Sequence, residues 1–244
     1  HDHLSSFSDS LSFEYDVMLL PDPALGDSVY GIINVSVTPI REKTSHTSQM
    51  IDQAILGNSV KILYETGDWY LCQTHYDYVG WISRSAVYKC DDAFRTYWEQ
   101  NAKYRLKDLS TMIHVEPNKL SMSVSDAVLN NRLVINDSLD QWFKVTLPDG
   151  RMGFIEKEKV ELNNKNIKSR DHETLIISNA LSMKGIPYLW GGNSSKGNDC
   201  SGFTQTVFKA AGIQLPRDAR QQAKIGKSIK IENLKKGDLL FFGS

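Results

Sequence analysis

At 244 residues the chain is longer than one typical domain, and its 41% hydrophobic and 23% charged residues exclude the disordered and collagen-like classes of protein. Its 28 basic and 29 acidic residues give a formal net charge of −1, so the composition indicates neither a nucleic-acid partner nor an anionic membrane partner. No apolar run reaches the roughly 18 residues of a membrane span, and we expect no transmembrane segment.

The N-terminal residues, beginning His1-Asp2-His3, lack the basic segment and apolar core of a signal peptide. We therefore expect either that a leader has been removed or that the protein is intracellular, and the residues do not decide between these alternatives.

A repeat organises the first two-thirds of the chain. Segment 56–87 matches segment 129–160 without a gap, 73 residues later. Apolar, aromatic and glycine positions coincide at Leu56/Leu129, Val60/Leu133, Ile62/Ile135, Trp69/Trp142, Tyr70/Phe143, Gly80/Gly153, Trp81/Phe154, Ile82/Ile155 and Val87/Val160. Self-similarity at a fixed spacing predicts two copies of one small structural unit.

Both copies are predicted to consist of short strands separated by turns. In the second copy, residues 141–146 alternate toward Pro148-Asp149-Gly150, a strong hairpin signal, whereas the first copy has a longer turn at 73–78. Units of about 55 to 65 residues are marginal on their own, so we expect each to pack against its neighbours.

The segment between the copies is predicted to be a helical connector over 91–107. Its aromatic and apolar residues recur at helical spacing, and we expect this face to pack in a core rather than to bind a ligand. The residues of the face are Phe94, Tyr97, Trp98, Ala102 and Leu106. A polar stretch at 162–166 predicts a linker after the second copy.

The chain has three cysteines, Cys72, Cys90 and Cys200, so at least one is unpaired within the chain. A Cys72–Cys90 disulfide is left open, but so few cysteines in a chain of this size favour free thiols over a disulfide framework.

The last seventy residues carry the pattern of a reactive cysteine. A helix is predicted from near Asp171 or Glu173 to Gly185, and a second helix is predicted to begin at Cys200 with Asp199 as its N-cap. Unpaired N–H groups and the helix dipole at such a position favour an anion, and the thiolate is the attacking form of cysteine. The alternative is a small buried cysteine beneath a loop.

The loop before Cys200 has the glycine spacing of a phosphate-binding loop at Gly192 and Gly197. Asn198 and Asp199 stand where such a loop requires Lys and Ser or Thr, so we exclude phosphate binding there.

Four motifs in this region resemble the NlpC/P60 family of cysteine peptidases. They are Tyr188-Leu189-Trp190-Gly191-Gly192, Asp199-Cys200-Ser201-Gly202-Phe203, Leu215-Pro216-Arg217-Asp218-Ala219 with Gln221 and Gln222, and Leu234-Lys235-Lys236-Gly237-Asp238-Leu239-Leu240-Phe241-Phe242. The repeated units resemble bacterial SH3 (SH3b) domains, and the combination resembles the γ-D-glutamyl-L-diamino acid endopeptidases, of the dipeptidyl-peptidase VI type.

The resemblance implies an α+β multidomain protein in which two SH3-like β-barrels precede a papain-like NlpC/P60 domain. We expect the following divisions: an N-terminal segment 1–28, a first SH3b domain 29–90, the helical connector 91–107, a second SH3b domain 108–162, a linker 163–173 and the catalytic domain 174–244.

The resemblance also implies roles for individual residues. Cys200 would be the nucleophile, and Tyr188 would stand beside the oxyanion site. Asp199, Ser201 and Trp190 would line the substrate site. Asp218 would help to bind the free amine of the substrate, and Tyr78 would belong to the wall with which the first SH3b domain closes that pocket. The residues alone indicate only that Asp218 begins a helix and that Tyr78 is a surface aromatic.

The activity implied is hydrolysis of the γ-D-glutamyl-L-diamino acid bond in murein peptides with a free N-terminal L-Ala, by a monomer without a metal or organic cofactor. A non-catalytic cell-wall-binding protein and an amidase or acyltransferase on the same fold are left open. We expect the periplasm or cell envelope, with the cytoplasm as the alternative.

The resemblance places the catalytic histidine just after the Gly237–Phe242 segment. We expect this histidine to lie beyond Ser244, the 244-residue chain alone to be inactive, and 239–242 to form an exposed apolar strand. None of the histidines present, including His46, His75, His114 and His172, stands at the family's position.

Overall fold

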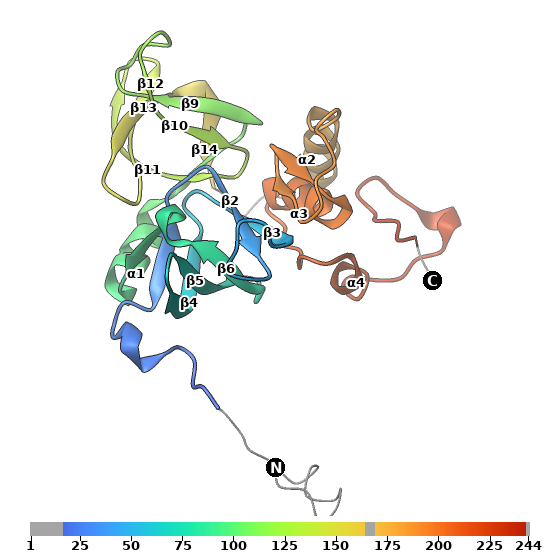
Figure 1. Ribbon diagram of the computed structural model, residues 1–244. Helices are drawn as coiled ribbons and strands as arrows, with labels where there is room; N and C mark the ends of the chain where they lie inside the picture. The colour runs from blue at the N-terminus through green and yellow to red at the C-terminus, as the bar shows by residue number, and fades with distance from the viewer. Residues whose placement is uncertain (1–16, 164–168, 243–244) are drawn as a thin grey trace, which may run out of the picture.

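The computed structural model describes residues 17–163 and 169–242. Two seven-stranded antiparallel sheets lie side by side, and a mainly helical C-terminal region packs against both (Figure 1). In the described part of the chain, none of the helices combines the length and apolar character needed to cross a bilayer.

The first barrel follows the short 3₁₀ helix η1 (Pro23–Leu25) and is built from neighbouring antiparallel strands in the order β3-β2-β6-β5-β4-β1-β7. Its elements are β1 (Tyr30–Ile33), β2 (Val37–Arg41), β3 (Met50–Ile55), β4 (Ser59–Thr66), β5 (Trp69–Thr74), β6 (Val79–Ser83), η2 (Arg84–Ala86) and β7 (Val87–Cys90). Alternate residues of these strands point inward, so that Ile33, Ile40, Ile62 and Ile82 form a buried core.

The second barrel repeats the first strand for strand, in the order β10-β9-β13-β12-β11-β8-β14. Its elements are β8 (Tyr104–Leu106), β9 (Ser110–His114), β10 (Ser123–Val128), β11 (Arg132–Leu139), β12 (Trp142–Thr146), β13 (Met152–Glu156), η3 (Lys157–Lys159) and β14 (Val160–Leu162). The predicted duplication is confirmed, as is the β12–β13 hairpin, whose turn places Gly150 at a φ of 87°.

The connector differs from the prediction at its C-terminal end. Helix α1 spans Asp92–Asn101 with Asp91 as its N-cap, and Trp98 is buried as expected, although Tyr97 is exposed. The prediction of helix up to residue 107 was wrong, because Tyr104–Leu106 is strand β8, paired with β11 and β14. Leu106 has the helical spacing, but it is buried in the core of the second barrel.

Equivalent leucines of the two barrels dock each barrel onto the next unit. Leu56, in the turn after β3, is buried in the core of the second barrel. Leu129, its counterpart in the repeat, is buried in the core of the C-terminal region. Each is followed by a residue at positive φ, 80° at Gly57 and 70° at Asn130, and glycine and asparagine tolerate that conformation best.

The C-terminal region packs α2 (Ser169–Ser182) against α3 (Cys200–Ala210), with Ile176, Val207 and Phe208 in their shared core. The hairpin of β15 (Asn193–Ser194) and β16 (Gly197–Asn198) precedes α3, and α4 (Ala219–Gln222) and η4 (Ile231–Asn233) follow it. Helix α2 begins before the predicted position, so 169–173 are helical, while residues 164–168 of the predicted linker lie outside the described residues.

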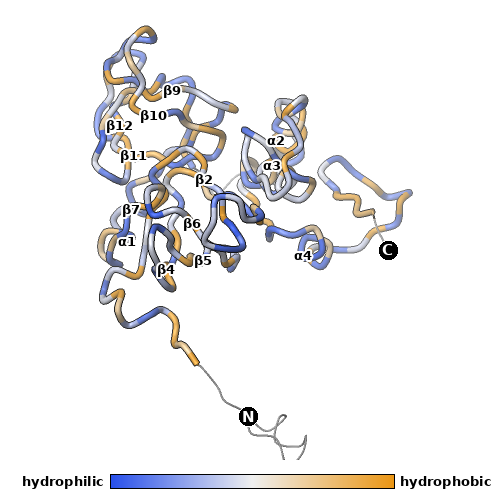
Figure 2. Tube along the Cα trace, viewed as in Figure 1, coloured by the Kyte–Doolittle hydropathy of each residue, from blue (hydrophilic) through white to orange (hydrophobic). Residues whose placement is uncertain are grey.

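The end of the described chain departs from the prediction of an apolar strand at 239–242. Leu239 packs against the core of the C-terminal region, and Leu240 and Phe242 are 57% and 91% exposed. The described residues there have no strand pairing, and Figure 2 shows their apolar character along the tube near the C-terminus.

Replacing Leu56 by alanine tests the docking of the two barrels. Because Leu56 is 0% exposed, we expect a loss of about 2–5 kcal/mol in the free energy of unfolding, measured in urea. The matched control is Leu120→Ala, which removes a side chain that is 93% exposed and should leave stability nearly unchanged. Equal stabilities of the two variants would contradict the docking role.

Candidate active site

Cys200 is the first residue of helix α3, as predicted. Asp199 is the N-cap, with extended backbone at φ −89° and ψ −175°, and its Oδ1 accepts a hydrogen bond from the Gly202 N–H at 2.8 Å. The Cys200 side chain is exposed, whereas Cys72 and Cys90 are buried. An exposed thiol at the positive end of a helix has the environment of a reactive nucleophile.

The loop before α3, which contains Gly191 and Gly192, packs directly against the start of this helix. Gly191 N–H donates to Asp199 Oδ2 at 3.0 Å, and Asp199 N–H donates to the Gly192 carbonyl at 3.1 Å. A Cβ atom on Gly202 would lie 2.0 Å from the Gly192 carbonyl oxygen. Glycine at position 202 therefore allows the loop to approach the first turn of α3 closely.

A buried arginine holds the N-cap residue in place. Arg217 is 2% exposed, and its Nη2 lies 2.6 Å from Asp199 Oδ2. Its Nη1 donates to Asp199 Oδ1 at 3.1 Å and to Ser201 Oγ at 2.9 Å. Burial opposes the charge of Asp199, but the Arg217 guanidinium and the Gly202 N–H hold the pKa of its carboxyl below its usual range.

The first barrel supplies the second partner of Arg217. Asp52 on β3 is 0% exposed, and its Oδ1 lies 2.6 Å from Arg217 Nε. Tyr76 and Asn193 also donate to the Asp52 carboxylate. Burial raises the pKa of Asp52, and the charge of Arg217 opposes that rise. Asp52, Arg217 and Asp199 thus form a buried chain of charges from the first barrel to the start of α3.

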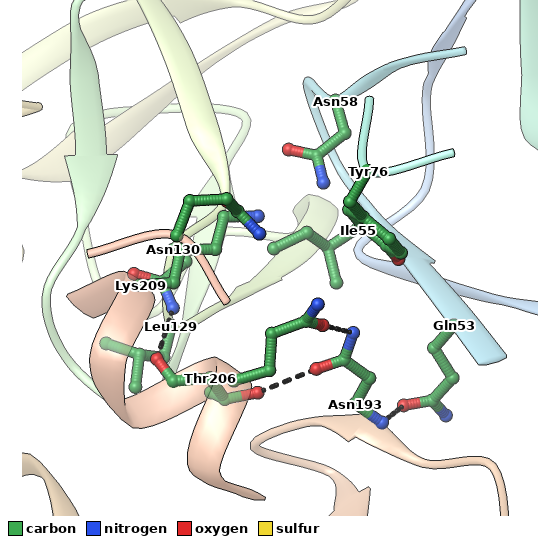
Figure 3. Close-up of a pocket in the computed structure, with 11 residues that line it drawn as sticks. Gln53, Ile55, Asn58, Tyr76, Leu129, Asn130, Asn193, Thr206 and Lys209 are labelled. Atoms are coloured by element: carbon green, nitrogen blue, oxygen red, sulfur yellow. Dashed lines mark hydrogen bonds between the residues drawn. The ribbon is translucent and has the colours of Figure 1, made fainter. Parts of the chain in front are cut away.

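The first barrel also contacts the loop before α3 directly. Gln53 Oε1 accepts from the Asn193 N–H at 2.8 Å, and Asn193 in turn bonds Thr206 and Gln205 of α3 (Figure 3). On the other side of the loop, a Cβ atom on Gly191 would lie 2.4 Å from the Met50 carbonyl oxygen of β3. The barrel backbone and the loop are therefore in close contact.

The second barrel holds the opposite end of α3. Arg105 on β8 donates to the carbonyls of Lys209 and Ala210 at 2.9 and 2.5 Å. Asn130 donates to the Thr206 carbonyl at 3.1 Å. The last carbonyls of a helix lack partners within it, and a cation there complements the dipole. Both ends of the nucleophile helix are thus fixed by a barrel.

The structure brings Tyr78 and Asp218 together, although 140 residues separate them in the sequence. The Tyr78 hydroxyl donates to Asp218 Oδ1 at 3.3 Å, and burial followed by the charge of Asp218 raises the pKa of Tyr78 to about 12. Asp218 directly follows Arg217 and is the N-cap of α4, as the residues alone predicted. The pair is therefore anchored to the same segment that holds Asp199.

The other predicted site residues lie in or beside the loop before α3. Tyr188 and Trp190 are 66% and 62% exposed, and Ser201 is buried against Asp199 and Arg217. The roles assigned to Tyr188 and Trp190 stay predictions. Asp52, Arg217 and Arg105 were not predicted. Arg217 stands within a recognised motif, but its partner Asp52 is 165 positions away in the sequence.

The remaining thiols, and the histidines His46, His75 and His114, have other surroundings than Cys200. Cys72 and Cys90 are free, and burial raises the pKa of the Cys90 thiol to about 12. His46 and His114 lie against Trp69 and Trp142, and His75 bonds Gln214. Among residues 17–163 and 169–242, no histidine is hydrogen-bonded to Cys200.

Comparison with known proteins yields two family models. One, described as NlpC/P60 family, matches residues 185–244, and one described as bacterial dipeptidyl-peptidase Sh3 domain matches residues 40–87. The chain is 30% identical over 203 residues to dipeptidyl-peptidase 6 of Lysinibacillus sphaericus, covering 80% of this chain and 74% of that protein. These matches confirm the resemblance that the motifs indicated.

A longer relative has a similar identity. The chain is 30% identical over 210 residues to the γ-D-glutamyl-L-lysine dipeptidyl-peptidase of Bacillus cereus, which covers 81% of this chain but 61% of that relative's length. A solved NlpC/P60 family protein from Bacillus cereus superposes with a TM-score of 0.74 at 22% identity, over 85% of this chain and 81% of that one. This likeness confirms the predicted fold class.

Thiol labelling of the native chain tests the difference between the three cysteines. We expect iodoacetamide to modify Cys200 quickly, because it is exposed, and Cys72 and Cys90 only after unfolding, because both are buried. Peptide mass spectrometry measures the rates, and Cys200→Ser is the control that should remove the fast phase. Fast labelling of Cys72 or Cys90 in the native state would contradict this arrangement.

Proposed function

The chain belongs to the NlpC/P60 family of cysteine peptidases, and from that membership we propose that it hydrolyses the γ-D-glutamyl-L-diamino acid bond of murein peptides. Two relatives have names that support this activity, dipeptidyl-peptidase 6 and γ-D-glutamyl-L-lysine dipeptidyl-peptidase. The observation that carries the proposal is the Tyr78–Asp218 pair. The phenol of Tyr78 belongs to the first barrel, and it donates a hydrogen bond to the carboxylate of Asp218, in the segment that fixes Asp199.

In this mechanism the Cys200 thiolate attacks the carbonyl carbon of the D-Glu side chain, forming a carbon–sulfur bond. The negative oxygen of the tetrahedral intermediate is stabilised by the backbone N–H of Cys200 and the Tyr188 hydroxyl. The carbon–nitrogen bond then breaks, the amine of the diamino acid leaves with a proton, and water hydrolyses the thioester to regenerate the thiol. In the NlpC/P60 family a histidine carries out these proton transfers.

Asp218 recognises the free N-terminal amine of the substrate. Its carboxylate offers a charge-assisted hydrogen bond to an ammonium group, and Tyr78 orients that carboxylate from the barrel side. Because the first barrel closes this end of the site, a peptide that extends beyond L-Ala is excluded. Release of L-Ala-D-Glu follows, which agrees with the dipeptidyl-peptidase names of the relatives.

The substrate places this activity in murein turnover. We assign the protein to the periplasm or cell envelope, where the murein is, with recycling of murein peptides in the cytoplasm as the alternative. The first barrel contacts the loop before α3 and the second barrel contacts the end of α3, and these contacts give both barrels a supporting role in the peptidase.

The direct test incubates the complete product of the gene with L-Ala-γ-D-Glu-meso-diaminopimelate and follows the products by mass spectrometry. The complete product is used because the chain spans 61% of the length of the Bacillus cereus relative. We expect free diaminopimelate with the wild type and none with Cys200→Ala. No release by the wild type would reject the substrate, and release by the variant would reject the nucleophile.

Asp218→Asn in the same protein tests recognition of the amine. Loss of a charged hydrogen bond of about 1.5–3 kcal/mol should lower kcat/KM for the free-amine peptide roughly 10- to 100-fold, while turnover of the N-acetylated peptide stays at its low level. Asp137→Asn, on an exposed position of the second barrel, is the matched control. An equal loss on both peptides would show that Asp218 acts on the fold and not on the amine.

A further inference from the structure

A cavity of about 460 Å³ lies where the three parts of the molecule meet. We call it the junction cavity; its wall includes Ser59 and His75 of the first barrel, Glu99 of α1, Arg132 of the second barrel, and Lys209 and Gln214 of the C-terminal region. Cavities of roughly 300–1,000 Å³ are the size that binds small molecules. A separate, much smaller void beside it is also lined by Lys209 and Gln214 (Figure 3).

The junction cavity is separate from the candidate active site. Lys209 stands in the last turn of α3, and Cys200 is the first residue of that helix. At 1.5 Å of rise per residue, the two positions are about 14 Å apart along the helix axis. A ligand in the cavity therefore does not occupy the position of the scissile bond.

The positive groups in the cavity wall lack carboxylate partners. The Lys209 ammonium makes no hydrogen bond or ion pair with any residue that the structure describes, and Arg132 makes no described ion pair. Arg132 donates from Nε and Nη2 to the backbone carbonyls of Ala102 and Glu99, which leaves Nη1 without a described partner. Two cations thus line one cavity, and neither forms an ion pair with a carboxylate among the described residues.

The acid in the wall is already engaged. Glu99 Oε2 lies 2.7 Å from Arg95 Nη1, and its Oε1 accepts from the Ser59 hydroxyl at 2.6 Å. Burial, and then the charge of Arg132, lower the pKa of Lys209 to about 8, and the charge of Asp52 offsets only part of that shift. A half-buried cation without a partner is unfavourable, and an anion in the cavity relieves that penalty.

We propose that the junction cavity binds a small oxyanion, a carboxylate or phosphate group, between Lys209 and the free Nη1 side of Arg132. Charge-assisted hydrogen bonds from an ammonium and a guanidinium are the strong interactions by which proteins hold such groups. The ligand joins the second barrel to the C-terminal region, so its binding stabilises their packed arrangement by mass action. This site is independent of the peptidase activity proposed above.

Calorimetric titration of the 244-residue chain tests the site, with sodium phosphate and sodium glutarate as separate probes at constant ionic strength. We expect the wild type to bind at least one probe, and the probe that binds identifies the source of the oxyanion. Lys209→Gln should weaken that binding at least tenfold, and Lys209→Arg should retain it. The matched control is Lys224→Gln, because Lys224 is exposed on the same region, and its binding should equal that of the wild type.

Two results overturn the proposal: no binding of either probe to the wild type, or binding to Lys209→Gln as tight as to the wild type. Near-UV circular dichroism checks that each variant is folded. A second test uses the wild type alone. Its amines are acetylated with and without the bound probe, and mass spectrometry measures the acetylation of each lysine. The bound probe should protect Lys209 and leave Lys224 unprotected, and equal protection of both would also overturn the site.

Discussion

The buried bridge of Asp52, Arg217 and Asp199 is the constraint on which the candidate site depends. Asp199 fixes the first turn of α3, and therefore Cys200, only while Arg217 holds both of its carboxylate oxygens. Arg217 in turn needs Asp52, because a buried guanidinium with unmatched charge is strongly unfavourable. A residue of the first barrel is thus part of the support of the nucleophile, which explains why the barrel and the catalytic region pack as one unit.

The duplication explains how the three units of the chain are joined in series. In each barrel the turn after the third strand carries a leucine and then a residue at positive φ, and this turn inserts into the next unit. The turn of the first barrel docks onto the second barrel, and the turn of the second barrel docks onto the C-terminal region. Repetition of one local structure therefore produces a linear series of interfaces, and the cavity between the three units lies at their meeting point.

Comparison of the sequence with itself predicted the repeat. Local sequence patterns predicted the hairpin at Gly150, the N-cap at Asp199 and the position of Cys200 in the first turn. They did not reveal the partners of Arg217 or the role of Arg105, because those contacts join residues 165 and 104 positions apart, which no local spacing encodes. The error at Tyr104–Leu106 has a similar cause. Leu106 satisfied the helical period, but pairing with β11 and β14 overrode that preference.

Amide hydrogen exchange at Gly202, followed by NMR, tests most directly whether the first barrel supports the nucleophile helix. In Asp52→Asn, Arg217 loses a buried charged partner and therefore holds Asp199 less firmly. Because the Gly202 amide donates to Asp199, it should exchange roughly 10- to 100-fold faster, as expected for a weakened charged hydrogen bond. The Ala211 amide at the other end of α3 should keep its wild-type rate. Unchanged exchange at Gly202 would contradict the dependence of the site on the barrel.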